Sequence, residues 1–141
     1  MITIDTNVLL RYLLSDDEIQ AKKATKLIES TQLVYVSQVV LVETIWTLKG
    51  KKYKQNPEQI NAVITALFEE ANIVMQDDDL VWRALADYRD QAVEKNVKVD
   101  FPDALIRQVG MDAAVQHGEK FGGFYTFDKD ARKAFSDAKS P

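Results

Sequence analysis

Cysteine is absent from this chain of 141 residues, which excludes disulfides, thiolate nucleophiles and cysteine-ligated zinc. Proline and glycine are scarce, at three and five residues, so long disordered linkers are not expected. No uncharged apolar run approaches the roughly 18 residues that a membrane span needs. The N-terminal residues 1–5 lack the basic start of a signal peptide. We therefore expect a cytoplasmic protein with no membrane segment.

Neither sign of charge dominates, because 18 basic residues face 22 acidic ones and the net charge is −4. A non-specific nucleic-acid binder is usually basic, so this value alone disfavours such a role. Bound cations, however, would reverse the field around the acidic side chains that hold them. Net charge therefore leaves nucleic-acid binding open.

Strands alternate with helices along the chain. Apolar and β-branched stretches predict strands at 2–4, 33–36, 72–75 and 123–127. Periodicity and capping residues predict helices at 7–14, 16–29, from Ser37 to a break at 49–54, from Pro57, at 78–96, at 100–117 and from Lys129. With no internal repeat or domain boundary, this alternation predicts an α/β sandwich around a mainly parallel sheet.

Four carboxylates stand where apolar residues are expected, and they are the most informative feature of the chain. They are Asp5, Glu43, Asp103 and Asp128. Glu43, for example, is the only charge within residues 39–46. Burying an unpaired carboxylate costs several kcal/mol or forces it to take up a proton. We therefore predict that the four side chains surround a divalent cation.

The places of these carboxylates in the predicted fold favour one shared pocket. Ligands of open parallel sheets bind beyond the C-terminal ends of the strands, and Asp5 and Asp128 follow the first and last strands. Asp103 falls in the first turn of a helix, and such turns face the same edge. An oxygen-only cluster selects Mg²⁺ or Mn²⁺, whose usual chemistry is in-line displacement at phosphorus. Phosphodiester hydrolysis is the reaction we expect.

Structural alternatives remain open for the aspartates. Asp103, like Asp100, could be a carboxylate favoured by the helix macrodipole, and Asp128 could cap the final helix. Residues 5–7 could form an ordinary strand-to-helix cap. Glu43 has no such alternative, because it lies inside a helix and no Lys or Arg is three or four positions away.

Other side chains have simpler interpretations. The lysine loop at 49–54 fits a solvated turn, with phosphate contact as its functional alternative. Its lysines are Lys49, Lys51, Lys52 and Lys54. The single histidine, His117, is expected at the surface near a helix C-terminus. Trp46 and Trp82 are expected in the core.

Four segments of the chain resemble the acidic motifs of the PIN-domain family and, more narrowly, of the VapC ribonuclease toxins of type II toxin–antitoxin modules. The segments are residues 4–12, 42–46, 100–106 and 126–130. Asp-Thr-Asn alone is a weak signal for this family. All four motifs, in this order and at these spacings, are a strong signal, and the match spans nearly the whole chain. The resemblance implies a three-layer α/β/α sandwich with a central, mainly parallel sheet of four or five strands, forming a single PIN domain over residues 1–141.

The same resemblance implies a Mg²⁺- or Mn²⁺-dependent endoribonuclease that acts as a toxin, with RNA as substrate, a cognate antitoxin as partner and a homodimeric state. The catalytic and metal-binding positions are Asp5, Glu43, Asp103 and Asp128, of which Asp5 and Asp103 are the most direct ligands. The supporting positions are Thr6, Asn7, Asp100, Thr126 and Asp130. Pro102 departs from the family pattern, in which a smaller residue is commoner.

Rival functions are disfavoured by particular residues or by chain length. A haloacid-dehalogenase-type phosphatase needs a second aspartate where this chain has Asn7. A structure-specific DNA nuclease of related fold normally has a longer chain. The rival from another class is a non-catalytic PIN-like binding or regulatory module. The intact acidic positions argue against it, because a degenerate copy would lose carboxylates that are costly to keep.

Overall fold

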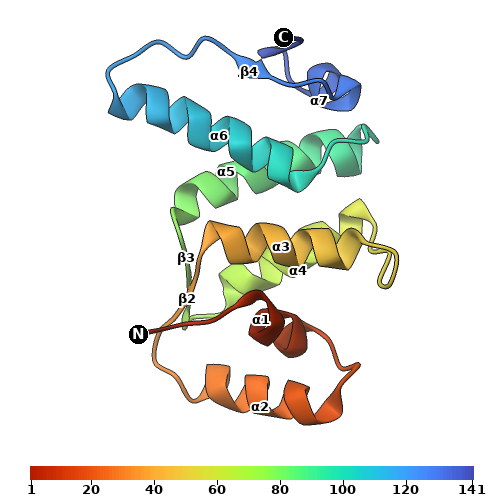
Figure 1. The fold of residues 1–141 in the computed structure, drawn as a ribbon, viewed down its shortest axis with the longest axis vertical. Coiled ribbons are helices and arrows are strands. Elements are labelled where there is room, and N and C mark those ends of the chain that lie inside the picture. The colour runs from red at the N-terminus through yellow and green to blue at the C-terminus, as the bar shows by residue number, and fades with distance from the viewer. The chain divides into compact units, whose positions relative to one another are not determined.

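The computed structural model of the chain describes residues 1–141, which form seven α-helices, one π-helical segment and five strands (Figure 1). The helices are α1 (Thr6–Leu13), α2 (Glu18–Glu29), α3 (Gln38–Lys49), α4 (Pro57–Glu69), α5 (Asp78–Tyr88), α6 (Phe101–Gln116) and α7 (Lys129–Ala134). The strands are β1 (Ile2–Thr3), β2 (Val34–Val36), β3 (Ile73–Met75), β4 (Phe124–Tyr125) and β5 (Ala138–Lys139). These elements group into two compact units, residues Met1–Asp78 and Asp79–Pro141.

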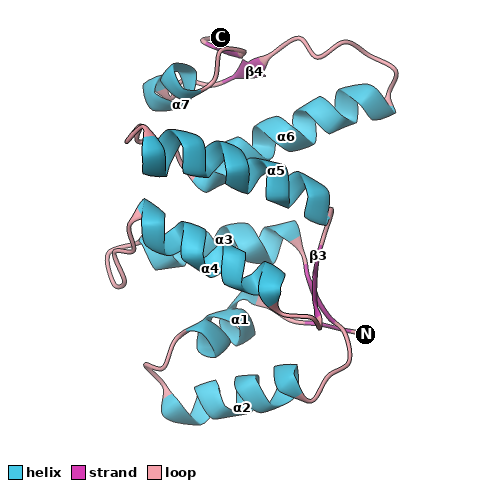
Figure 2. Ribbon diagram, turned by 180° about the vertical axis from the view of Figure 1, so that it is seen from behind, coloured by secondary structure: helices cyan, strands magenta, loops and turns pink.

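The first unit contains a three-stranded parallel sheet in the order β1–β2–β3, drawn in magenta beside the helices in Figure 2. Val34 in the central strand pairs with Ile2 on one side and with Ile73 on the other. Because the strands are parallel, their C-terminal ends share one edge, and Asp5 follows β1 there. This edge is where ligands of open parallel sheets bind.

Side-chain caps start the helices of the first unit. Asp17 caps α2, Ser37 caps α3 and Asn56 caps α4. Asn56 and Gln59 form a reciprocal capping box, in which each side chain accepts the other's backbone N–H at 2.8–2.9 Å. The caps satisfy N–H groups that a helix start leaves unpaired, so these boundaries are set locally. The fully buried aliphatic core of the unit comprises Leu9, Ile28, Val34, Val36, Leu41, Ile45, Leu48, Ile60, Ile64 and Leu67.

The second unit contains α5, α6, α7 and the parallel pair β4–β5. In its core the rings of Tyr88 and Phe101 meet edge to face, with centroids 6.0 Å apart. Gly123 precedes β4 with a φ of +132°, and a Cβ at this position would lie 3.0 Å from the carbonyl oxygen of Asp137. Only glycine combines this backbone conformation with the close approach that lets β4 pair with β5.

The α/β class and the parallel strands expected from the sequence are confirmed. The five strands form one sheet of three and one of two, instead of a single sheet of four or five, because β4 and β5 belong to the second unit. The sequence pattern misses β5 altogether, since two residues are too few to show a periodicity.

The helix expected over 78–96 changes character before its end. α5 stops at Tyr88, and a π-helical segment, η1 (Arg89–Glu94), continues from it. The N–H of Lys95 donates to the carbonyl of Asp90 five residues earlier, at 3.1 Å. The segment ends at Glu94 with Lys95 as its C-cap, and the next residue, Asn96, has a φ of +56°, a conformation that asparagine tolerates better than most residues.

The prediction that both tryptophans lie in the core is wrong. Trp46 is 59% exposed and Trp82 is 48% exposed. On α3 the buried positions are taken by Leu41, Ile45 and Leu48, which leaves Trp46 on the other side of the helix. His117 is exposed at the end of α6, as expected. None of the helices combines the length and the apolar character that a membrane crossing requires.

Candidate active site

Asp5 links the end of β1 to the start of α1. Its backbone is extended, and its Oδ1 accepts the N–H of Val8 at 2.9 Å, so Asp5 is the N-cap of α1. The side chain is exposed, and its second oxygen, Oδ2, takes no part in the cap. The capping interpretation is therefore correct for Asp5, and it leaves one carboxylate oxygen for a ligand.

Glu43 reaches the start of α1 from α3. The hydroxyl of Thr6 donates to Glu43 Oε2 at 2.6 Å, the short distance expected of a hydrogen bond to a carboxylate. Thr6 directly follows Asp5, so one hydrogen bond brings two of the four predicted carboxylates to the same helix end. Glu43 is exposed on its helix, and its Oε1 is not part of this bond.

The second unit carries the other two carboxylates at two helix starts. Asp103 is half-buried in the first turn of α6, and Asp100 is the N-cap residue of that helix without a side-chain capping bond. Asp128 caps α7, because its Oδ1 accepts the N–H of Asp130 at 2.8 Å. The hydroxyl of Thr126 accepts the N–H of Asp128 at 3.0 Å. The capping interpretation therefore holds for Asp128 as well.

The expectation that the four carboxylates are buried is wrong. Asp5, Glu43 and Asp128 are exposed, and Asp103 is half-buried. Two of them occupy helix N-cap positions, where the carboxylate keeps access to water while its apolar neighbours pack inward. Neither unit by itself contains a group of three or more acidic or histidine side chains that could hold a metal ion. The shared four-carboxylate site stays a prediction.

A pocket of about 310 Å³ lies next to Asp5, between α1 and α2. Its lining residues are Asp5, Asn7, Val8, Arg11, Gln20, Lys23, Ala24 and Leu27. Only Asp5 and Asn7 among them were predicted from the sequence as site residues. The spacing of Asn7 and Arg11, four residues apart on one helix, is a signal that could have added Arg11. The presence of Lys23 in the pocket lining depends on how α2 packs against α1, and a local sequence pattern does not show this packing.

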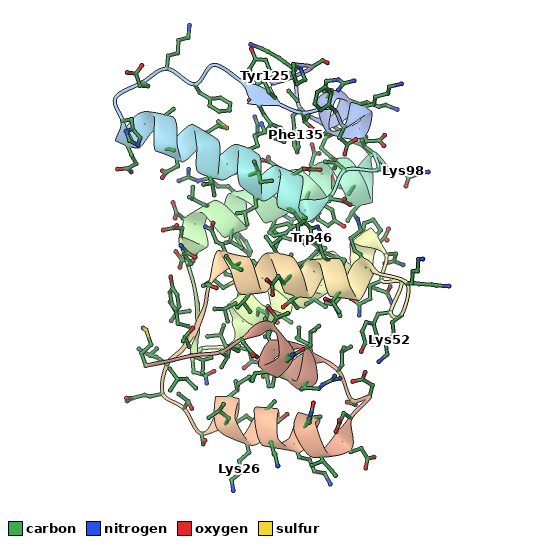
Figure 3. The ribbon with its side chains drawn as sticks, viewed as in Figure 1. Lys26, Trp46, Lys52, Lys98, Tyr125 and Phe135 are labelled. Atoms are coloured by element: carbon green, nitrogen blue, oxygen red, sulfur yellow. The ribbon has the colours of Figure 1, made fainter.

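A cluster around Asp16 connects this pocket to the lysine loop. Asp16 accepts hydrogen bonds from Arg11 at 2.7 Å, from the Tyr53 hydroxyl at 2.5 Å and from Lys52 at 3.3 Å. Led by the bond from Tyr53, these donors lower the pKa of Asp16 to about 2. Figure 3 shows Lys52 on the loop that follows α3. Lys52 thus has a structural role, whereas Lys51 and Lys54 of the same loop are simply exposed.

We expect the Asp16 carboxyl to titrate near pH 2 in an NMR pH titration of its side-chain carbon. Because this pKa is lowered, the stability that the cluster contributes is present above pH 3.8 and is lost as the pH falls toward 2. Tyr53→Phe should raise the Asp16 pKa toward 3.8, since it removes the largest cause of the shift. Tyr35→Phe is the matched control, and an Asp16 pKa near 3.8 in the unmodified protein would contradict this assignment.

The fold and the acidic positions together define a class of protein, a small α/β protein with parallel strands and carboxylates at several of its helix starts. The chain belongs to the PIN domain family, which it matches over residues 2–135. Members of this family are nucleases. No match was found among curated proteins.

Among solved structures, the chain is similar to Mycobacterium tuberculosis VapC20, a sarcin–ricin loop cleaving toxin. The two chains are 20% identical, the similarity covers 95% of each, and the TM-score is 0.41. The family assignment rests on the PIN match and not on this similarity.

Proposed function

We propose that this protein is a Mg²⁺- or Mn²⁺-dependent endoribonuclease that hydrolyses RNA phosphodiester bonds as the toxin of a type II toxin–antitoxin module. The observation that carries the proposal is the 2.6 Å hydrogen bond from Thr6 to Glu43, directly beside Asp5, in a chain of the PIN family. The nuclease class comes from the family, and the toxin role comes from the resemblance of its four acidic segments to those of VapC toxins.

The ligand set that we propose for the metal ion is Asp5, Glu43, Asp103 and Asp128. These donors fit Mg²⁺ or Mn²⁺, because they are carboxylate oxygens and the chain offers no thiolate. In the first unit, Asp5 Oδ2 and Glu43 Oε1 are not used by the cap or by the bond from Thr6. When bound, the ion would supply Lewis-acid stabilisation of the charge at a scissile RNA phosphate and lower the pKa of water.

Neighbouring polar groups orient Glu43 and the loop that carries Asp128. Thr6 fixes the direction of the Glu43 carboxylate through its short hydrogen bond. In the second unit, Thr126 accepts the Asp128 N–H, and the Arg132 guanidinium donates to the Thr126 carbonyl at 2.9 Å. These bonds position the loop that carries Asp128. Asp100 and Asp130 are the acidic neighbours that we propose as assisting residues, and Asn7 as a polar contact beside Asp5.

The partners follow from the toxin role. We propose a cognate antitoxin that silences the nuclease, a homodimeric assembly and action on cytoplasmic RNA. The exposed Lys51 and Lys54 of the lysine loop are available for contacts with RNA phosphates. Lys52 is held by Asp16, so its contribution to RNA binding would compete with that ion pair.

The test is cleavage of total cellular RNA by the antitoxin-free protein with Mg²⁺ or Mn²⁺, beside an Asp103→Asn variant prepared identically. We expect metal-dependent products with the unmodified protein and none with the variant, because the variant lacks one proposed ligand. Sequencing the new RNA ends identifies the target. Equal cleavage by both proteins, retained after further purification, would mean that cleavage does not depend on Asp103 and would refute its assignment as a ligand.

Metal binding distinguishes the enzyme from a non-catalytic PIN-like module. A protein that holds the ion only in its folded state gains stability with added Mn²⁺, so the melting temperature rises with Mn²⁺ concentration. If neither cleavage nor an Mn²⁺-dependent rise in melting temperature is observed, the protein is a binding or regulatory module instead.

A further inference from the structure

The pocket beside Asp5 is lined by both apolar and charged side chains. Its apolar wall is formed by Val8, Ala24 and Leu27. The lining also contains the carboxylate of Asp5 and two cationic side chains, Arg11 and Lys23. Its volume of about 310 Å³ falls at the lower end of the range of small-molecule sites. A single nucleotide unit has both chemical parts, an anionic phosphate and a flat base.

Arg11 is oriented toward the pocket without using all of its donors. Its Nη1 donates to Asp16 at 2.7 Å and its Nε donates to Gln20 at 2.9 Å. Both partners lie outside the α1 helix, and the Tyr53 hydroxyl also interacts with the guanidinium, so the group is fixed in place with some of its five N–H donors still unused. A prearranged guanidinium loses little conformational entropy when it binds a phosphate.

Lys23 supplies a second cation from the facing helix α2. It is exposed, lines the same pocket as Arg11 and takes part in no ion pair within the first unit. Two cations with available donors therefore stand on opposite helices around a shared opening. An anionic group in this opening would contact both cations, and the remainder of the same ligand would contact the apolar wall.

We propose that this pocket binds one unpaired nucleotide of the RNA substrate, next to the phosphate that is cleaved. Arg11 and Lys23 bind the phosphate of this nucleotide, and its base lies against Val8, Ala24 and Leu27. The inference rests on the proposed function, because Asp5, a proposed metal ligand, lines the same pocket. An acidic peptide would also satisfy the two cations, but the neighbouring metal ligand favours a second phosphate of the same RNA strand.

The inference is tested by RNA binding without cleavage, in the Asp103→Asn background with Mg²⁺ present. The probe is a fluorescein-labelled single-stranded RNA oligonucleotide, and the readout is fluorescence anisotropy. We expect Lys23→Gln to weaken binding about five- to tenfold, as the loss of one charge-assisted contact does. The slope of log K against log salt should fall by about 0.7, the value for one phosphate contact on a single strand.

Lys26→Gln is the matched control for the charge. Lys26 is on the same helix, does not line this pocket, and projects away from α1 in Figure 3. Leu27→Ala, compared with Leu33→Ala, tests the apolar wall. These two leucines are similarly exposed, at 43% and 39%, but only Leu27 lines the pocket. We expect Leu27→Ala to weaken binding about threefold and Leu33→Ala to leave it unchanged.

The outcomes separate this inference from the proposed function. Equal effects of Lys23→Gln and Lys26→Gln, with RNA still bound, would overturn the nucleotide site and leave the ribonuclease proposal intact. Absence of RNA binding by the Asp103→Asn protein, together with absence of metal-dependent cleavage by the unmodified protein, would overturn both. A loss of affinity confined to Lys23→Gln and Leu27→Ala would establish the site.

Discussion

Replacing Asp5 by asparagine is expected to slow RNA cleavage about a thousandfold and to leave the free energy of unfolding within about 0.5 kcal/mol of the original. Asparagine is as good an N-cap as aspartate, because its side-chain oxygen can also accept the N–H of Val8. It lacks the negative charge that a divalent cation requires. Single-turnover cleavage and urea denaturation measure the two effects separately.

Asp5→Ala is the companion variant, since alanine removes both the cap and the charge. It should lose cleavage to the same extent and, in addition, about 1 kcal/mol of stability. If Asp5→Asn cleaves RNA at the original rate, Asp5 is a capping residue only and the proposed ligand set is wrong. The same comparison applies to Asp128, whose Oδ1 caps α7 through the N–H of Asp130.

The helix starts were the part of the fold that the sequence predicted best. Asp17, Ser37 and Asn56 each cap a helix within one or two residues of the expected position. Capping is decided by groups two or three residues apart in the chain, so a local pattern contains all the information that it needs. The end of α5 could not be predicted in this way. The π-helical segment that follows it is defined by which backbone carbonyl each N–H donates to, and side-chain patterns do not show that.

The residues of the candidate site stay a prediction, and the contacts that surround them could not be predicted from the sequence. Thr6 and Glu43 are 37 positions apart, and their hydrogen bond follows from helix packing that a single sequence does not encode locally. The position of Lys23 at the pocket and the hydrogen bond from Tyr53 to Asp16 also depend on helix and loop packing that the sequence does not encode locally. Apolar neighbours suggested buried carboxylates, yet a residue at a helix N-cap can face water while the residues on either side of it pack inward.

Replacing Arg107 by methionine should lower the free energy of unfolding by about 3 kcal/mol, because it leaves partly buried carboxylates without their counter-ion. The Arg107 side chain is only 16% exposed and binds both oxygens of Asp137, through Nε at 2.7 Å and Nη2 at 2.8 Å. Its Nη1 donates to Asp87 at 3.2 Å, and its guanidinium lies 4.9 Å from the centre of the Phe135 ring. One side chain thus joins α5, α6 and the segment before β5.

Arg83→Ala provides the control for this loss, because Arg83 pairs with Asp79 on the same unit but both side chains are about 60% exposed. Such a pair contributes only about 0.3–0.5 kcal/mol. The dependence on pH identifies the cause. The hydrogen bonds from Arg107 lower the pKa of Asp137 from its usual 3.8, so the stability that the pair contributes is present above pH 3.8 and is lost as the pH falls below it. The difference between the original protein and Arg107→Met should therefore be constant near neutral pH and shrink in acid. A difference that does not change with pH would mean that Arg107 stabilises the second unit by packing against Phe135 and not by its charge.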